Sequence, residues 1–127
     1  MELGMIGLGR MGANMTERLV KGGHRVVGFD PKAEARARVE DKGAESAASL
    51  DLLVSGLKQP RTLWMMVPSG SITDGTVTAL LALLAPGDVL VDGGNANFKD
   101  TLRHWTVAAA KQIAFVYFGT SGGAWGQ

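Results

Sequence analysis

Residues 7–12 read Gly-Leu-Gly-Arg-Met-Gly, directly after the apolar run Leu3–Ile6 and directly before a segment with helical periodicity. Glycines at this spacing suit a turn from a strand into a helix. The first permits a tight turn, the second lets phosphates approach the backbone, and the third allows close packing of the helix. The N–H groups at the start of that helix attract an anion. The stretch therefore predicts a strand, a glycine-rich turn and a helix that together bind a dinucleotide.

The residues after the turn continue this pattern. Met11, Met15 and Leu19 recur every four residues, as on one face of a helix. The β-rich run Arg25–Phe29 then ends in Asp30, about 20 residues beyond the glycines, where a carboxylate can accept hydrogen bonds from ribose hydroxyls. The alternative interpretation is a plain glycine-rich turn and a solvated acid. The order of strand, glycines, helix, strand and acid favours the dinucleotide site.

Strand-like and helix-like segments alternate along the rest of the chain. We expect further strands at residues 44–46, 63–67, 89–91 and 113–118, and further helices at residues 32–41, 50–57, 77–84 and 98–109. Ser49 is an expected helix cap. The apolar stripes of the last two helices are Val77, Leu80, Leu81 and Leu84, and Phe98, Leu102, Trp105 and Ala109. This alternation predicts an α/β fold, a doubly wound parallel sheet in one domain over residues 1–127.

Composition excludes several classes of protein. The 127 residues include 13 basic and 12 acidic ones and carry a net charge of +1, and because the basic residues are scattered we expect no nucleic-acid surface. There is no Cys, which excludes disulfides and zinc–thiolate sites, and we expect no bound metal. No apolar run approaches the roughly 20 residues that cross a bilayer. These features predict a cytoplasmic protein without membrane contact.

Glycine-rich or polar turns follow four of the expected strands, at residues 7–12, 68–70, 93–95 and 121–123. The carboxyl ends of parallel strands meet at one edge of a sheet, where ligands of open α/β sheets bind. We therefore expect a single cleft, with a cofactor near the first three turns and a substrate toward the last two.

Five stretches resemble the decarboxylating 6-phosphogluconate dehydrogenase family, in particular its short, NAD-preferring branch. They are Gly7–Met15, Gly23–Val26, Met66–Pro68, Asp92–Asn95 and Gly119–Gly126. The resemblance implies a Rossmann fold and an oxidoreductase of the pentose phosphate pathway or gluconate metabolism. It implies oxidation of 6-phosphogluconate at C3 by hydride transfer to a nicotinamide, followed by decarboxylation to ribulose 5-phosphate. It further implies a homo-oligomer.

The resemblance also implies a role for each matching position. The expected cofactor-binding residues are Gly7, Leu8, Gly9, Arg10, Met11, Gly12, Asp30, Pro31, Lys32, Val67, Pro68, Ser69 and Asn95. The expected substrate-binding residues are Asn95, Ser121, Gly122 and Gly123.

The choice of cofactor depends on Asp30. NADP-using relatives tend to carry Asn-Arg-Thr where this chain has Asp30-Pro31-Lys32, so a 2′-phosphate meets a carboxylate here. Two like charges in contact repel by about 1 kcal/mol even in water. We expect NAD to be preferred, with NADP possible because Lys32, Arg36 and Arg38 offer phosphate partners.

The family's catalytic lysine has no counterpart here. It lies in a helical domain after the Ser-Gly-Gly motif, beyond Gln127, and Lys58, Lys99 and Lys111 stand in other segments. We therefore expect the helical domain to be absent and these 127 residues to bind nucleotide and to turn over substrate poorly or not at all. Two alternatives stay open: another β-hydroxyacid dehydrogenase, of the 3-hydroxyisobutyrate type, or a stand-alone nucleotide-binding module without catalysis.

Overall fold

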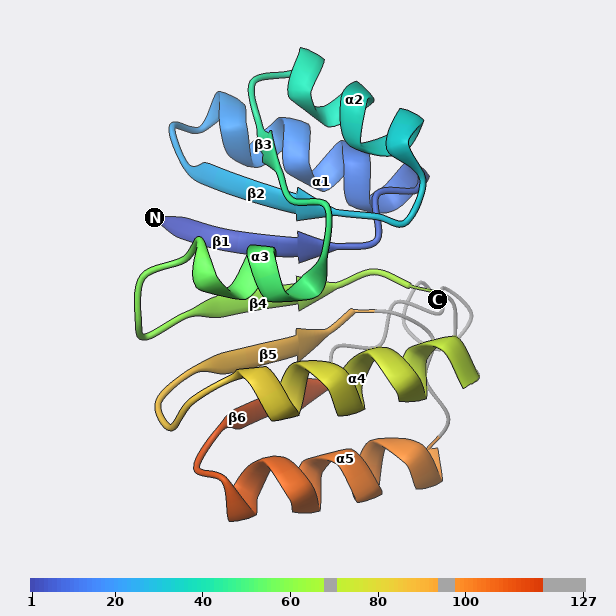
Figure 1. The fold of residues 1–127 in the computed structure, drawn as a ribbon, viewed down its shortest axis with the longest axis vertical. Coiled ribbons are helices and arrows are strands. Elements are labelled where there is room, and N and C mark those ends of the chain that lie inside the picture. Colours follow the sequence, from blue (N-terminus) through green and yellow to red (C-terminus); the bar gives the residue numbers. More distant parts are fainter. Residues whose placement is uncertain (68–70, 94–97, 118–127) are drawn as a thin grey trace, which may run out of the picture.

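The computed structural model describes residues 1–67, 71–93 and 98–117, and its strands form one all-parallel sheet with helices on both faces (Figure 1). The strands are β1 (Glu2–Ile6), β2 (Arg25–Phe29), β3 (Glu45–Ser46), β4 (Thr62–Met65), β5 (Val89–Asp92) and β6 (Ala114–Tyr117). The helices are α1 (Arg10–Lys21), α2 (Ala33–Asp41), α3 (Leu50–Ser55), α4 (Ser71–Leu83) and α5 (Phe98–Ala110). The strand order is β3-β2-β1-β4-β5-β6. The predicted doubly wound α/β fold is confirmed.

Two apolar cores lie on the two faces of the sheet. Successive residues of a strand point to opposite faces, so Leu3 and Met5 of β1 join the core under α1 and α2, whereas Ile6 joins the core under α3, α4 and α5. Burial on both faces explains why β1 is apolar almost throughout, as strands of parallel sheets usually are.

Local sequence signals orient α3 and α4 as expected, although α4 begins at Ser71, before the predicted start at residue 77. The Ser49 side chain accepts a hydrogen bond from the Leu52 N–H at 3.1 Å, which caps the start of α3. The stripe predicted for α4 is buried at every position: Val77, Leu80, Leu81 and Leu84. Hydrophobic periodicity is sufficient to orient this helix.

The apolar stripe predicted for α5, in contrast, is exposed at two of its large side chains. Leu102 and Trp105 are 50% and 56% exposed, and α5 turns His104 and Ala108 toward the core instead. The His104 Nε2 lies 2.7 Å from Asp74 Oδ1 on α4, and its ring meets Phe115 edge to face. These contacts fix the rotation of α5 against its own hydrophobic pattern.

The prediction of a buried stripe on α1 is partly wrong. Met15 and Leu19 pack against the core, but Met11 is 55% exposed. The positions of α1 that are fully buried are Gly12 and Thr16. Small side chains there let the helix approach the glycine turn more closely than a methionine allows.

A buried carboxylate, Asp88, joins the loops at the amino ends of β4 and β5. It is fully buried and accepts hydrogen bonds from the Arg61 backbone N–H at 2.7 Å, Arg61 Nη1 at 3.0 Å and the Ala85 N–H at 2.9 Å. A buried charge with this many donors is compensated, and it becomes costly to disturb.

Candidate functional site

The predicted dinucleotide turn lies where the strand order reverses, between β1 and its neighbours β2 and β4. Gly7 has φ of +93°, and its N–H donates to the Phe29 carbonyl at 2.9 Å. A Cβ on Gly7 would lie 2.5 Å from the Met66 carbonyl oxygen. Both the backbone conformation and the space therefore require glycine, which confirms the tight turn expected there.

Gly12 and Gly9 differ in what surrounds them. A Cβ on Gly12 would lie 1.9 Å from the Gly7 carbonyl oxygen, so the start of α1 packs directly against the turn, as expected. A Cβ on Gly9 would meet nothing within 4 Å. Gly9, Arg10 and Met11 form the exposed crest of the turn, and open space lies in front of Gly9.

The crest presents backbone donors. The first hydrogen bond inside α1 runs from the Ala13 N–H to the Gly9 carbonyl at 2.8 Å, so the N–H groups just before Ala13 have no acceptor within the helix. The helix dipole adds partial positive charge at this end. Gly9 as N-cap brings no side-chain acceptor that would compete for these donors. The arrangement fits the phosphates of a nucleotide.

Asp30 lies at the side of the same turn. Its Oδ2 accepts a hydrogen bond from the Leu8 N–H at 2.9 Å, and its Oδ1 accepts one from the Lys32 N–H at 2.9 Å. Arg36 Nη1 donates to the Asp30 carbonyl at 2.7 Å. A carboxylate has about four acceptor positions, so about two remain available here. The sequence placed Asp30 near the turn, but nothing in it indicated the bond to Leu8 or the contact of Arg36.

The carboxyl ends of β4 and β5 reach the turn from the other side. Val67 lies against Gly7, and the Trp64 Nε1–H donates to the Met66 sulfur at 3.0 Å. A Cβ on Gly93 would lie 2.3 Å from Trp64 Nε1 and 2.7 Å from that sulfur. The turn at 7–12, residues 66–67 after β4 and Gly93 after β5 therefore share one edge of the sheet. The close cover of Gly93 by Trp64 and Met66 was not anticipated from the sequence.

Some of the expected site residues lie outside the described residues. These are Pro68, Ser69, Asn95, Ser121, Gly122 and Gly123. Pro31 and Lys32, beside Asp30, are described and exposed. The described part of the site is thus the turn, Asp30 with its two neighbours, and Val67.

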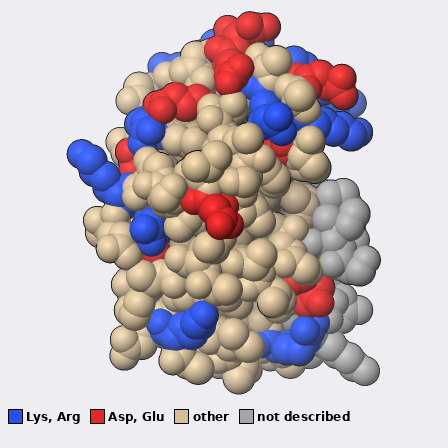
Figure 2. Space-filling view, viewed as in Figure 1, with Lys and Arg blue, Asp and Glu red and all other residues tan. Residues whose placement is uncertain are grey.

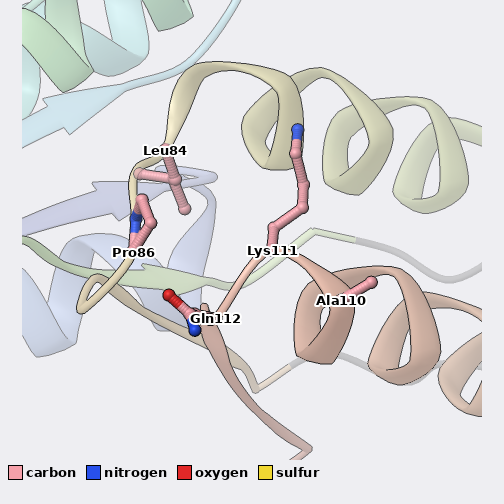
Figure 3. A pocket seen from close by; sticks show the side chains of 5 residues that line it. All are labelled: Leu84, Pro86, Ala110, Lys111 and Gln112. Carbon is pink, nitrogen blue, oxygen red and sulfur yellow. The ribbon is translucent and has the colours of Figure 1, made fainter.

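Two of the three lysines considered above lie at the opposite edge of the sheet. The Lys58 N–H donates to Glu2 at the amino end of β1, at 2.8 Å. Lys111 Nζ donates to the Leu81 carbonyl at 2.6 Å, beside a pocket of about 310 Å³ between the ends of α4 and α5 (Figure 3). That pocket is also lined by Leu84, Pro86, Ala110 and Gln112. Neither lysine is placed to act at the glycine turn.

The surface charge is unevenly distributed. Charged side chains gather over α1 and α2 at the top of Figure 2, whereas the surface over α3 and α4 is mostly uncharged. Among the described residues, no helix has the length and apolar character to cross a membrane, and no three potential metal ligands come together.

Comparison with known proteins gives a match over nearly the whole chain. Residues 2–127 match the family model described as the NAD binding domain of 6-phosphogluconate dehydrogenase. An NAD(+)-dependent, decarboxylating 6-phosphogluconate dehydrogenase from Haloferax volcanii is 46% identical over 123 residues, which are 97% of this chain and 40% of that protein. A decarboxylating 6-phosphogluconate dehydrogenase from Staphylococcus aureus is 38% identical over 126 residues, with 96% of this chain and 27% of its own length covered. The chain thus spans less than half the length of these relatives.

Solved structures give the same fold. The 3-hydroxyisobutyrate dehydrogenase of Mycobacterium tuberculosis superposes with a TM-score of 0.83 at 26% identity, covering 91% of this chain and 39% of that one. The 6-phosphogluconate dehydrogenase of Plasmodium falciparum superposes with a TM-score of 0.84 at 23% identity, covering 96% of this chain and 27% of that one.

Proposed function

The chain belongs to the family of NAD-binding domains of 6-phosphogluconate dehydrogenase, and from that membership we propose that it binds a dinucleotide at the Gly7–Gly12 turn. The backbone of the turn holds the pyrophosphate, and Asp30 holds the adenine ribose, with Pro31 and Lys32 beside it. The bond from the Leu8 N–H to Asp30 Oδ2 carries this proposal, because it sets a carboxylate with spare acceptor positions directly beside the glycine turn, whose Gly9 faces open space. Val67, Pro68, Ser69 and Asn95 border the nicotinamide half.

NAD is the preferred cofactor in this proposal. A 2′-phosphate near Asp30 meets a negative charge, which costs about 1 kcal/mol even in water and more in a partly desolvated site. Arg36 reduces this preference for NAD. Its Nη1 donates to the Asp30 carbonyl, and the rest of the guanidinium group can donate to a 2′-phosphate. The Haloferax volcanii relative, named as NAD(+)-dependent, supports the same preference.

The reaction proposed for the complete enzyme is the oxidative decarboxylation of 6-phosphogluconate. Bound NAD supplies the hydride acceptor. Asn95, Ser121, Gly122 and Gly123 hydrogen-bond the sugar acid, since an amide and exposed backbone groups suit hydroxyl and carboxylate oxygens. The C3 hydroxyl must lose its proton to a positioned base, which typically contributes 10² to 10⁴-fold. Lys58 and Lys111 lie at the opposite edge of the sheet, so the 127 residues alone bind nucleotide and turn over poorly.

Calorimetric titration of the purified chain tests the binding proposal. We expect NAD to bind with a dissociation constant at least tenfold lower than that of NADP, because of the charge of Asp30. Tighter binding of NADP than of NAD would refute the preference, and absence of binding to either nucleotide would refute the site. Asp30→Asn removes that charge and should narrow the difference between NAD and NADP, and Asp51→Asn, at an exposed carboxylate on α3, is its matched control.

A second candidate activity is that of a 3-hydroxyisobutyrate dehydrogenase. It is favoured by the similarity to the Mycobacterium tuberculosis structure, at a TM-score of 0.83 and 26% identity. Steady-state assays of a full-length enzyme carrying this domain, with 6-phosphogluconate and with 3-hydroxyisobutyrate, distinguish the two. We expect turnover of 6-phosphogluconate only. Turnover of 3-hydroxyisobutyrate alone would transfer the assignment to that enzyme, and no turnover of either substrate would favour a nucleotide-binding module without catalysis.

A further inference from the structure

Arg10 carries a charge that is unfavourable for the helix in which it lies. It is the first residue of α1, follows the N-cap Gly9, and is exposed. The amino end of a helix carries partial positive charge, so a cation there is repelled. The first turn of α1 contains no acidic residue that would offset this repulsion. The fold alone therefore gives no reason for an arginine at this position.

Two basic residues later in the chain, Lys21 and Arg25, have acidic partners, whereas Arg10, like Arg18 further along α1, has none among the described residues. Lys21 lies 3.0 Å from Glu17, and Arg25 is paired with Glu2 and Glu45. Arg10 forms no side-chain hydrogen bond or ion pair with any residue in the described ranges. Its guanidinium group is thus available to a ligand at the crest of the turn, where the space in front of Gly9 is open.

We propose that the Arg10 side chain is a positioning residue for the diphosphate of the bound dinucleotide. This inference rests on the proposed function, in which the backbone of the turn holds that diphosphate. A planar guanidinium donates two parallel hydrogen bonds to phosphate oxygens, and it adds a full charge to the partial charges of the helix end. The site then has opposite charges at its two ends, with Asp30 facing the ribose and Arg10 facing the phosphates. The bound anion supplies the negative charge that the first turn of α1 lacks.

Arg10→Gln tests this proposal, with Arg18→Gln as the matched control. Arg18 lies in the last turn of the same helix, is exposed, and forms no ion pair with a described residue, so both variants lose one charge from α1. Dissociation constants are measured for NAD, for ADP-ribose, which keeps the diphosphate, and for adenosine, which has no phosphate. We expect Arg10→Gln to weaken NAD and ADP-ribose about tenfold and to leave adenosine unchanged, because a charge-assisted hydrogen bond is lost. Arg18→Gln changes all three by less than about twofold.

The thermal unfolding midpoint without ligand is a second readout. Arg10→Gln raises the midpoint, because an unfavourable charge leaves the amino end of α1, whereas Arg18→Gln lowers it, because a favourable charge leaves the carboxyl end. An arginine that only stabilises the turn predicts the reverse sign for Arg10→Gln.

The outcomes separate this inference from the function on which it rests. If the unaltered chain binds neither NAD nor ADP-ribose, the proposed function fails and the inference fails with it. If the unaltered chain binds NAD and Arg10→Gln binds it equally well, only the role of Arg10 is overturned. Equal weakening of NAD and adenosine by Arg10→Gln also overturns that role, because it shows a general distortion of the site.

Discussion

The two halves of the sheet are covered differently. The half with β1, β2 and β3 has α1 and α2 on one face and α3 on the other (Figure 1). Among the described residues, the half with β5 and β6 is packed by helices, α4 and α5, on one face only; on the other face Val89 and Val91 are half-buried, and Val116 is 46% exposed. Parallel sheets are normally buried on both faces. Within the part of the chain that the structure describes, the first half is thus covered on both faces, whereas the second leaves apolar surface uncovered.

The difference extends to how each half is stabilised. The first half depends on close backbone packing around the glycine turn, where an added methyl group has no room at Gly7 or Gly12. The second half depends on polar contacts between loops and helices, at the buried Asp88 and at the partly buried pair of Asp74 and His104. Substitutions in the two halves should therefore act by different mechanisms, and four of them test the contrast.

Asp88→Ala, in the second half, should have the largest effect. It leaves the Arg61 guanidinium and two backbone N–H groups without their buried acceptor. We expect a loss of about 3–5 kcal/mol in the free energy of unfolding, measured by urea denaturation. Asp41→Ala, at an exposed carboxylate at the end of α2, should change it by less than about 0.5 kcal/mol. Equal effects of the two substitutions would show that Asp88 does not join the loops.

Gly12→Ala, in the first half, should be next. Its Cβ would lie 1.9 Å from the Gly7 carbonyl oxygen, so the turn must shift away from α1. We expect a loss of about 3 kcal/mol in stability, together with loss of NAD binding in the same titration. Gly9→Ala is the control, since its Cβ meets nothing within 4 Å. It should cost less than about 1 kcal/mol in stability while still weakening NAD. A Gly12→Ala variant as stable as Gly9→Ala would contradict the close packing.

Gly75→Ala, in the second half, should have a smaller effect of opposite sign. Gly75 lies inside α4, is exposed, and has free space around its missing Cβ. Alanine restricts the unfolded chain more than glycine does, so we expect a gain of about 0.5–1 kcal/mol by urea denaturation. A loss of stability would mean that α4 needs the glycine for a contact that its open surroundings do not indicate.

Sequence periodicity predicted those elements whose orientation follows from hydrophobicity alone. The stripe from Val77 to Leu84 is buried as expected, Ser49 caps α3, and the alternation of segments gave the correct sheet class. The order of glycine turn, strand and Asp30 placed the carboxylate beside the turn. In each case the signal lies within one element or between elements that are neighbours in the chain.

The main feature that the sequence missed depends on a pair of residues that is distant in the chain. The rotation of α5 is set by His104 against Asp74, some 30 residues away, and it exposes Leu102 and Trp105 despite their apolar side chains. The exposure of Met11 has a local cause: α1 packs against the turn through Gly12, which leaves no room for the side chain of Met11 on that side. A hydrophobic pattern predicts which face of a helix is apolar, but it does not predict which polar side chains form a contact that turns another face toward the core.

The smallest expected effect is a pH dependence at the α4–α5 contact. Hydrogen bonds from His104 and then from Arg103, at 2.7 Å and 2.6 Å, hold the pKa of Asp74 below its ordinary value. A carboxyl group with a lowered pKa in the folded state stabilises the fold fully above its unfolded pKa, about 3.9, and loses that contribution as pH falls through the lowered value.

Urea denaturation from pH 3 to pH 7 should therefore show Asp74→Asn less stable than the unaltered chain near neutrality, with the gap closing below about pH 4. Asp51→Asn, in the first turn of α3, controls for the helix dipole and should give a narrower gap. A gap for Asp74→Asn that is constant from pH 7 to pH 3 would remove the ionised carboxylate from the contact that orients α5.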